Sequence, residues 1–451
     1  MAELSTSSIN AQLRTIAVPA AIGFLFSTLF NVVDSFFAGQ IGTDAIAGMT
    51  LAFPVFFLLL SLAAGMGNAV NALASIALGK NDKQRFGGVV IHGVVIALAL
   101  GIIVPLIAPY LARGVFALQG AEEQAQQYAL RYVRTVMIGF VFFMLNFTFN
   151  GALYAQGNSK PFRNFLIVAS VVNIVLNPIF IYGVWIIPPL DTAGIALATV
   201  LVQMGGTVYL FFKLKNSPNV GWHFIKTLRV KVALVGELLR QGLPASMNNA
   251  TIALGVFVIN FYVQFYGGTD TLAAYGIATR IEQLALVPTI GLNVAVIAIV
   301  GRNFGAERMD NIYLTWKKAI KAGLMIMAGG LLVIVPFAPL LIGIFDSTPA
   351  VVSAGSRYLR IEALAFLSYV FLNVTVSLLQ GVKKPSFALY IGMYRQILPL
   401  GLFYLLGTIA GLGIDGVWWG IVIINWSAVA ISLLYASKIL GRIGLQLESS
   451  G

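Results

Sequence analysis

The chain has 451 residues, of which 59% are hydrophobic and only 10% are charged. A typical soluble domain has about 25% charged residues, so this composition excludes an ordinary soluble globular fold. The formal net charge is +12, and the absence of cysteine rules out disulfides and thiol chemistry. We therefore start from the expectation of a membrane protein.

Apolar runs long enough to cross a bilayer core of about 30 Å recur along the whole chain. Because the segment before the first run lacks a basic start and a cleavage site, we expect the first helix to be retained rather than removed as a signal peptide. The predicted fold class is an all-α membrane protein with twelve transmembrane helices. The predicted helices lie near residues 15–38, 46–78, 86–111, 125–155, 162–187, 193–213, 233–266, 272–300, 316–345, 351–380, 386–410 and 416–440.

The basic residues are distributed unevenly between the two sides of such a protein. If both ends of the chain face the cytoplasm, most of the 28 lysines and arginines fall in inner loops. This is the positive-inside bias, and it predicts a multi-pass protein with both termini cytoplasmic. The basic surplus then reflects topology and contact with anionic lipid, so we expect no nucleic-acid partner.

The sequence repeats itself in two halves. The segment GTDAIAG at 42–48 returns as GTDTLAA at 268–274, and RYVR at 131–134 returns at the same interval as RYLR at 357–360. A repeat this long predicts two duplicated lobes rather than a solenoid. Because each lobe has an even number of spans, both copies enter the membrane from the same side, as in one class of secondary transporter. We predict a first lobe at 1–213, a cytoplasmic linker at 214–232 and a second lobe at 233–451.

Duplicated lobes in lipid favour alternating access, and fit a passive channel less well. We do not expect an enzyme, because the two histidines, His92 and His223, have no paired second ligand and cysteine is absent. No phosphate-binding motif of the G-x-x-x-x-G-K-[ST] kind occurs, so direct use of ATP is not expected. We therefore expect no cofactor and no metal site, and an ion gradient as the energy source.

A single carboxylate, Asp34, lies within the apolar first span, in FNVVDSFFAG. At the repeat interval it pairs with Asn260, so the second copy keeps a polar side chain without the charge. Placing a charge near the centre of a membrane helix costs about 2.5–3.5 kcal/mol or more, which packing alone would not require. We predict that Asp34 is functional; the alternative is a hydrated position near the outer surface.

Several amides and hydroxyls in the first half have spacings that could bring them to one acid. Asn173 and Asn177 are four residues apart and share a helix face just before Pro178, and Asn146 and Asn150 have the same spacing. Polar groups in lipid need partners, and a shared cluster supplies them. Two other acids, Glu282 and Glu362, follow arginines closely. We interpret both as residues in structural contacts.

These features together resemble the multidrug and toxic compound extrusion (MATE) family over essentially the whole chain, and its prokaryotic DinF-type branch in particular. The NorM-type branch is less similar, because 250–257 and 364–373 lack the acids that its members carry in helices seven and ten. The resemblance rests on the paired lobes, the acid in the first helix, and the segments GALYAQGNSKP (151–161), NIVLNPIFIYG (173–183) and GIALATVLVQ (194–203).

The resemblance implies a V-shaped pair of six-helix bundles that exports amphipathic cations in exchange for protons or Na⁺. It also implies a set of proton- and substrate-binding positions and a proline hinge. Some DinF-type members have an aspartate at the position of Asn177. This chain therefore has a single acid, Asp34, in the first-lobe site. The matching residues are Asp34, Asn173, Asn177, Asn150, Thr199 and Tyr132 for binding, and Pro19 for the hinge.

The mechanism we expect is competition at Asp34, where burial disfavours the charged form and protonation removes the charge that holds a cationic substrate. Proton and substrate then weaken each other's binding reciprocally. The expected partners are small cationic drugs and membrane lipid, and we expect a monomer. The alternative is a flippase for lipid or polysaccharide precursors, which would need a cationic cavity. The intramembrane basic residues are only Arg280 and Arg395, both in the second lobe.

Overall fold

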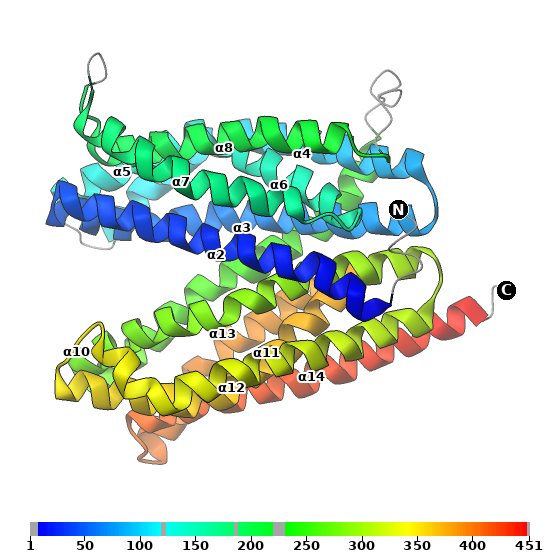
Figure 1. Ribbon diagram of the computed structural model, residues 1–451. Coiled ribbons are helices and arrows are strands. Elements are labelled where there is room, and N and C mark those ends of the chain that lie inside the picture. Colours follow the sequence, from blue (N-terminus) through cyan, green and yellow to red (C-terminus); the bar gives the residue numbers. More distant parts are fainter. Residues whose placement is uncertain (1–7, 119–122, 185–187, 220–230, 449–451) are drawn as a thin grey trace. The chain divides into compact units, whose positions relative to one another are not determined.

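The computed structural model describes residues 8–118, 123–184, 188–219 and 231–448 (Figure 1). Most of this described chain is helical. The elements are α2 (Ile9–Ile41), α3 (Thr43–Gly79), α4 (Lys83–Leu118), α5 (Glu123–Ile138), α6 (Phe140–Ala155), α7 (Lys160–Tyr182), α8 (Asp191–Lys215), α10 (Val232–Gly305), α11 (Met309–Gly343), α12 (Pro349–Gly381), α13 (Ser386–Tyr404), the short π-helix η1 (Leu405–Ile409) and α14 (Ile414–Glu448).

The helices confirm the predicted all-α membrane fold. Ten of the described helices are long and apolar enough to cross a membrane, and the pair α5 and α6, bent by 52° at Gly139, adds an eleventh span. The long helix α10 contains two of the predicted spans, because its backbone leaves the helical conformation at Gly268. Each of the twelve predicted spans therefore has a helical counterpart.

Glycine ends the first span of each repeat in the same way. Gly42 separates α2 from α3 with φ 145°, and Gly268, at the matching position of the second repeat, interrupts α10 with φ 70°. Side chains with a Cβ rarely adopt such positive φ values, whereas glycine adopts them freely. The repeated GTD segment is thus a repeated chain turn.

The chain forms two compact units whose boundaries are related by the repeat. One unit comprises Ile22–Met247, and the other combines the start of α2, up to Ala21, with the residues from Asn248 onward. Ala21 and Met247 are one repeat interval apart, so the first helix of each repeat changes unit at the equivalent turn. A proline precedes both changes, Pro19 in α2 and Pro244 in α10.

Two equivalent glycines of the repeat allow helix backbones to pack closely near the points where the chain passes from one unit to the other. In the first unit, a Cβ on Gly65 would lie 2.5 Å from the backbone nitrogen of Ser246. In the second, a Cβ on Gly291 would lie 2.4 Å from the carbonyl oxygen of Ala17. Real Cβ atoms do not approach so closely, so only glycine lets these backbones meet.

An arginine–aspartate ion pair is also repeated. Arg131 on α5 pairs with Asp191 at the start of α8, at 3.4 Å, and Arg357 on α12 pairs with Asp415 at the start of α14. Both arginines come from the repeated RYxR segments. The pairs are largely exposed, so each contributes little to stability, but they show that the two units share one internal arrangement.

Residues 220–230 of the predicted linker, including His223, lie outside the described residues, and the predicted lobe boundaries stay a prediction. The described ends of the linker are held by side chains. Asn219 Nδ2 donates to Gln156 Oε1 at 3.1 Å, and the backbone N–H of Lys231 donates to His92 Nε2 at 2.8 Å. The other ring nitrogen of His92 lies 2.7 Å from the Gly88 carbonyl, which gives this histidine a structural role.

Candidate functional site

Asp34 lies on the inner face of α2, and the helical period places it there. Phe30, Asp34 and Ala38 follow one another at four-residue intervals and are all buried, with Asp34 only 4% exposed. Val32 and Phe36, on the opposite face, are 59% and 62% exposed. A stripe of this kind turns one face of a helix inward. The burial of the side chain disfavours the alternative that Asp34 is hydrated at the outer surface.

Two neutral side chains from other helices hold the carboxylate. Asn177 Nδ2, on α7, donates to Asp34 Oδ1 at 3.0 Å, and Thr199 Oγ1, on α8, donates to Oδ2 at 3.2 Å. Asn177 Nδ2 also donates to Asn173 Oδ1, one turn earlier on α7, at 3.1 Å. The four residues therefore form one connected polar group, which we call the Asp34 cluster.

The cluster is buried and, among the described residues, includes no basic side chain. Asn173 and Asn177 are 0% exposed and Thr199 is 2% exposed. In the part of the chain that the structure describes, Asp34 forms no ion pair. Two buried polar atoms of the cluster, Asn173 Nδ2 and Asn177 Oδ1, lack a hydrogen-bond partner. Such atoms are rare in folded proteins, and here they leave capacity to bind a ligand.

Two further residues expected at the site are buried in the same unit, and no hydrogen bond from either to the carboxylate occurs among the described residues. Tyr132, on α5, is 5% exposed, packs edge-on against Phe56, and is near enough to Asp34 to interact with it electrostatically. Asn150, on α6, is 2% exposed, and its Oδ1 has no hydrogen-bond partner. Both residues belong to the same unit as Asp34.

The asparagine that shares the spacing of Asn150 has a different environment. Asn146 Nδ2 donates to Gln203 Oε1 at 2.7 Å and its Oδ1 accepts from Thr207 Oγ1 at 2.9 Å, which ties α6 to α8. This amide is satisfied within its own pair of helices. Its spacing from Asn150 therefore does not bring it into the Asp34 cluster.

The predicted hinge residue, Pro19, is buried inside α2, which runs through it as one continuous helix. The boundary between the two units falls two residues later, at Ala21 and Ile22. Beyond this point α2 packs against α7: a Cβ on Gly23 would lie 3.2 Å from Arg163 Cα, and Ser170 Oγ donates to the Phe26 carbonyl at 2.9 Å. Pro19 therefore lies where the helix passes from one unit to the other.

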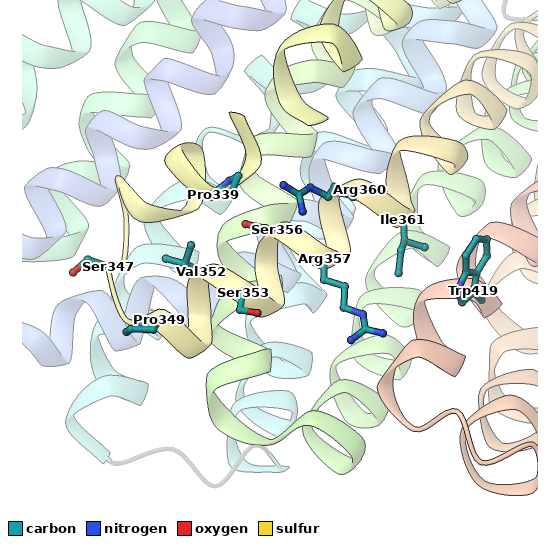
Figure 2. Close-up of a pocket in the computed structure, with 10 residues that line it drawn as sticks. All are labelled: Pro339, Ser347, Pro349, Val352, Ser353, Ser356, Arg357, Arg360, Ile361 and Trp419. Carbon is teal, nitrogen blue, oxygen red and sulfur yellow. The ribbon is translucent and has the colours of Figure 1, made fainter. Parts of the chain in front are cut away.

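A surface pocket in the second unit is separate from the Asp34 cluster. Figure 2 shows Ser353, Arg357 and Arg360 projecting from α12, with Trp419 contributed by α14. The pocket shares no residue with the cluster, and Arg357 is engaged in its ion pair with Asp415. We therefore do not regard this pocket as the candidate site.

A bundle of spanning helices that encloses a carboxylate, with no basic side chain paired to it among the described residues, defines a class of protein. Ionisable groups inside the membrane are rare, and they mark ion and substrate pathways. The fold and the site together are those of a multi-pass membrane transport protein.

Comparison with known proteins identifies the family. The family model for MatE matches residues 19–179 and 244–405, so each match begins at or beside one of the prolines that precede a change of unit. The chain belongs to the MatE family. This membership confirms the MATE resemblance of the sequence, whereas the DinF-type branch stays a prediction.

Similar proteins extend over nearly the whole chain. "Probable multidrug resistance protein YoeA" of Bacillus subtilis is 27% identical, over 95% of this chain and 93% of its own. An "FAD transporter" of Shewanella oneidensis is 26% identical, over 92% and 90%. The solved structure of an outward-facing multidrug resistance MATE family transporter of the MOP superfamily is 25% identical and covers 98% of both chains, with a TM-score of 0.90.

Proposed function

We propose that this chain is a secondary active multidrug exporter that expels amphipathic cations from the bacterial cytoplasm across the inner membrane, in exchange for protons. The observation that carries the proposal is the Asp34 carboxylate, which is enclosed among helices and, within the described residues, accepts hydrogen bonds from neutral donors alone. Family membership and the names of the relatives support export as the direction and drugs as the substrates.

The exchange follows from the charge of the cluster. With Asp34 ionised, the cluster carries one uncompensated negative charge in a region of low dielectric, which strongly favours an arriving cation. Binding a proton to the carboxylate removes that charge, so a protonated site no longer attracts a cationic substrate. The two ligands then oppose each other, and this opposition is reciprocal by thermodynamic linkage.

The amides of the cluster have a part in each state. Asn177 Nδ2 and Thr199 Oγ1 donate to the ionised carboxylate and keep it in place. The unpartnered Asn177 Oδ1 is an acceptor, which suits an ammonium group of a substrate or a protonated carboxyl. Carboxylate and amide oxygens are also ligands for hard cations such as Na⁺, so Na⁺ is the alternative coupling ion.

The conformational half of the proposal rests on Pro19. A proline inside a helix donates no backbone hydrogen bond and lets the helix bend at low cost. Since α2 carries Asp34 in one unit and Pro19 at the edge of the other, a change of charge at Asp34 and a change of shape at Pro19 act on the same helix. We propose that neutralisation of Asp34 biases α2 between straight and bent forms.

The relatives also bring in a second class of substrate. The FAD transporter of Shewanella oneidensis is named for an anionic dinucleotide, which the negative Asp34 cluster would not attract directly. A precursor flippase would likewise need positive charge, and a passive channel would need no coupling. These alternatives make different predictions for one assay.

Efflux from proteoliposomes under a single imposed gradient tests the proposal. Purified protein is reconstituted, loaded with ethidium or with FAD, and placed under a pH gradient alone or a Na⁺ gradient alone. Our proposal requires ethidium transport that depends on the pH gradient and is lost in Asp34→Asn. Efflux driven only by the Na⁺ gradient would transfer the coupling to Na⁺. Substrate movement without dependence on either ion gradient would identify a channel.

A further inference from the structure

The second unit encloses its own group of ionisable side chains, far along the chain from Asp34. Glu362, on α12, is 1% exposed, and Glu282, in the second span of α10, is 9% exposed. The two carboxylates interact electrostatically with each other and with Arg395 on α13. We call these three residues, with Tyr358 and Tyr369, the Glu282 cluster. The sequence had suggested only structural contacts for both acids.

Tyrosine hydroxyls donate hydrogen bonds to both carboxylates. Tyr358 Oη donates to Glu282 Oε2 at 3.1 Å, and Tyr369 Oη donates to Glu362 Oε1 at 2.9 Å. The second oxygen of Glu362, Oε2, is buried and has no hydrogen-bond partner. An acceptor-only carboxylate oxygen in this position is costly, and a bound ligand would relieve that cost.

Arg395 lies near the acids but is held elsewhere. Its Nε donates to Asn425 Oδ1, on α14, at 2.9 Å, and its guanidinium lies 5.3 Å from the centre of the Tyr369 ring. Neither glutamate forms an ion pair within the described ranges of the chain. The guanidinium therefore compensates the acids from a distance and does not bind either one directly.

The equivalent positions of the first unit show whether the fold needs acidic side chains here. At the repeat interval, Tyr358 corresponds to Tyr132, Glu282 to Phe56 and Tyr369 to Phe143. In the first unit Phe56 packs against both partners, with ring centres 6.3 Å and 6.0 Å apart. An apolar aromatic cluster thus fills the same place, so packing does not explain buried acids in the second unit.

The charges of the Glu282 cluster are unbalanced by one. Two carboxylates and one guanidinium leave a single net negative charge in a buried region, where unpaired charge is strongly disfavoured. The other titratable groups that face the acids are the neutral phenols of Tyr275, Tyr358 and Tyr369. One added proton makes the whole cluster neutral.

We propose that Glu282 and Glu362 share one proton and make the second unit a proton-binding site independent of Asp34. The proton comes from water and adds to one carboxylate oxygen, and no other covalent bond changes. The proposal goes beyond the exchange at Asp34 and does not depend on it, because proton binding by this cluster is measurable in protein that does not transport.

Infrared spectroscopy of the purified full-length protein in nanodiscs tests this proposal. The C=O stretch of a protonated carboxyl is recorded over a series of pH values in Asp34→Asn and in the triple variant that adds Glu282→Gln and Glu362→Gln. Exposed carboxyls cancel in the difference between the two. We expect a band with the amplitude of one carboxyl that appears as the pH falls. Glu307→Gln in the Asp34→Asn background, which changes an exposed acid, is the control and must leave this band in place.

Further variants keep the proposal testable if the glutamine variants do not fold. Tyr358→Phe and Tyr369→Phe keep the rings and remove only the hydroxyl donors, and each should shift the frequency of the band, because hydrogen bonding sets the C=O stretch. The proposal would be overturned if no band appeared, or if two bands titrated as separate carboxyls. It would also be overturned if neither tyrosine variant shifted the frequency of the band, or if the band followed the Na⁺ concentration at constant pH.

Discussion

Replacement of Asp34 by asparagine should separate folding from function, and the hydrogen bonds indicate why. Asn177 Nδ2 can still donate to the side-chain oxygen of an asparagine at position 34. Thr199 Oγ1, which lies 3.1 Å from the Ile195 carbonyl, can donate there and accept from the new amide. The existing donors stay paired, and removal of the buried charge offsets the second N–H of the new amide, so we expect the free energy of unfolding of Asp34→Asn to stay within about 1 kcal/mol of the parent.

Asp34→Ala provides the contrast. Thr199 keeps its bond to Ile195, but one N–H of Asn177 loses its partner, since the other N–H already binds Asn173. An unsatisfied buried donor costs about 1–3 kcal/mol, so the alanine variant should be less stable by that amount. Thermal unfolding of the purified variants measures this difference.

We expect transport by these variants to depend on the charge at position 34 and not on the free energy of unfolding. Asp34→Asn holds the cluster neutral, so it should lose efflux driven by a pH gradient and the proton release that accompanies substrate binding. Asn260→Ala, the matching position of the second repeat, should have a milder effect and serves as the control. Normal pH-driven efflux by well-expressed Asp34→Asn would refute the mechanism.

Three further predictions concern the hinge, the topology and the packing. Pro19→Ala should slow turnover more than it weakens substrate binding, because a bend and not a contact is lost; equal losses, measured by efflux and by equilibrium binding, would argue against a hinge. A cysteine at exposed Asn216 should react with an impermeant reagent only from the cytoplasmic side, and one at exposed Ser347 only from outside; the reverse pattern would invert the topology. Gly151→Ala should destabilise the protein by about 1–3 kcal/mol, because its Cβ would lie 2.3 Å from a backbone oxygen of α3. Gly205→Ala, where a Cβ meets nothing within 4 Å, is the control and should be neutral or stabilising; a loss of stability in both variants would contradict the packing argument.

The helices were predictable because a bilayer imposes long apolar segments that any window of the sequence shows. Matching segments of the two halves indicated the repeat, and the structure gives these segments a physical role as turns at Gly42 and Gly268. Periodicity could not predict where the units divide. That boundary depends on which backbones pack together, and Gly65 and Gly291 reveal those contacts only in three dimensions.

The candidate site was predictable where spacing along one helix sufficed. The four-residue interval placed Asn173 and Asn177 on one face of α7, and the lone charge singled out Asp34. The same spacing wrongly grouped Asn146 with Asn150, because Asn146 bonds to residues of α8. Spacing shows which residues share a helix face, but it does not show which helix packs against that face. For Glu282 and Glu362 the sequence suggested structural contacts, but spacing along a helix could not show that tyrosines, Tyr358 and Tyr369, would donate to the two carboxylates.

The repeat turns these two sites into a controlled comparison. Both units share the frame of helices, the turn at glycine and the arginine–aspartate pair, yet the first has its acid on α2 and the second has acids on α10 and α12. Duplication therefore conserved the scaffold, while the position of the charge changed. If the cluster in each unit binds a proton, the protein carries two ionisable sites on unrelated positions of one frame. Asp34→Asn would then abolish exchange yet keep a proton-dependent infrared signal, and Glu362→Gln would remove that signal with Asp34 intact.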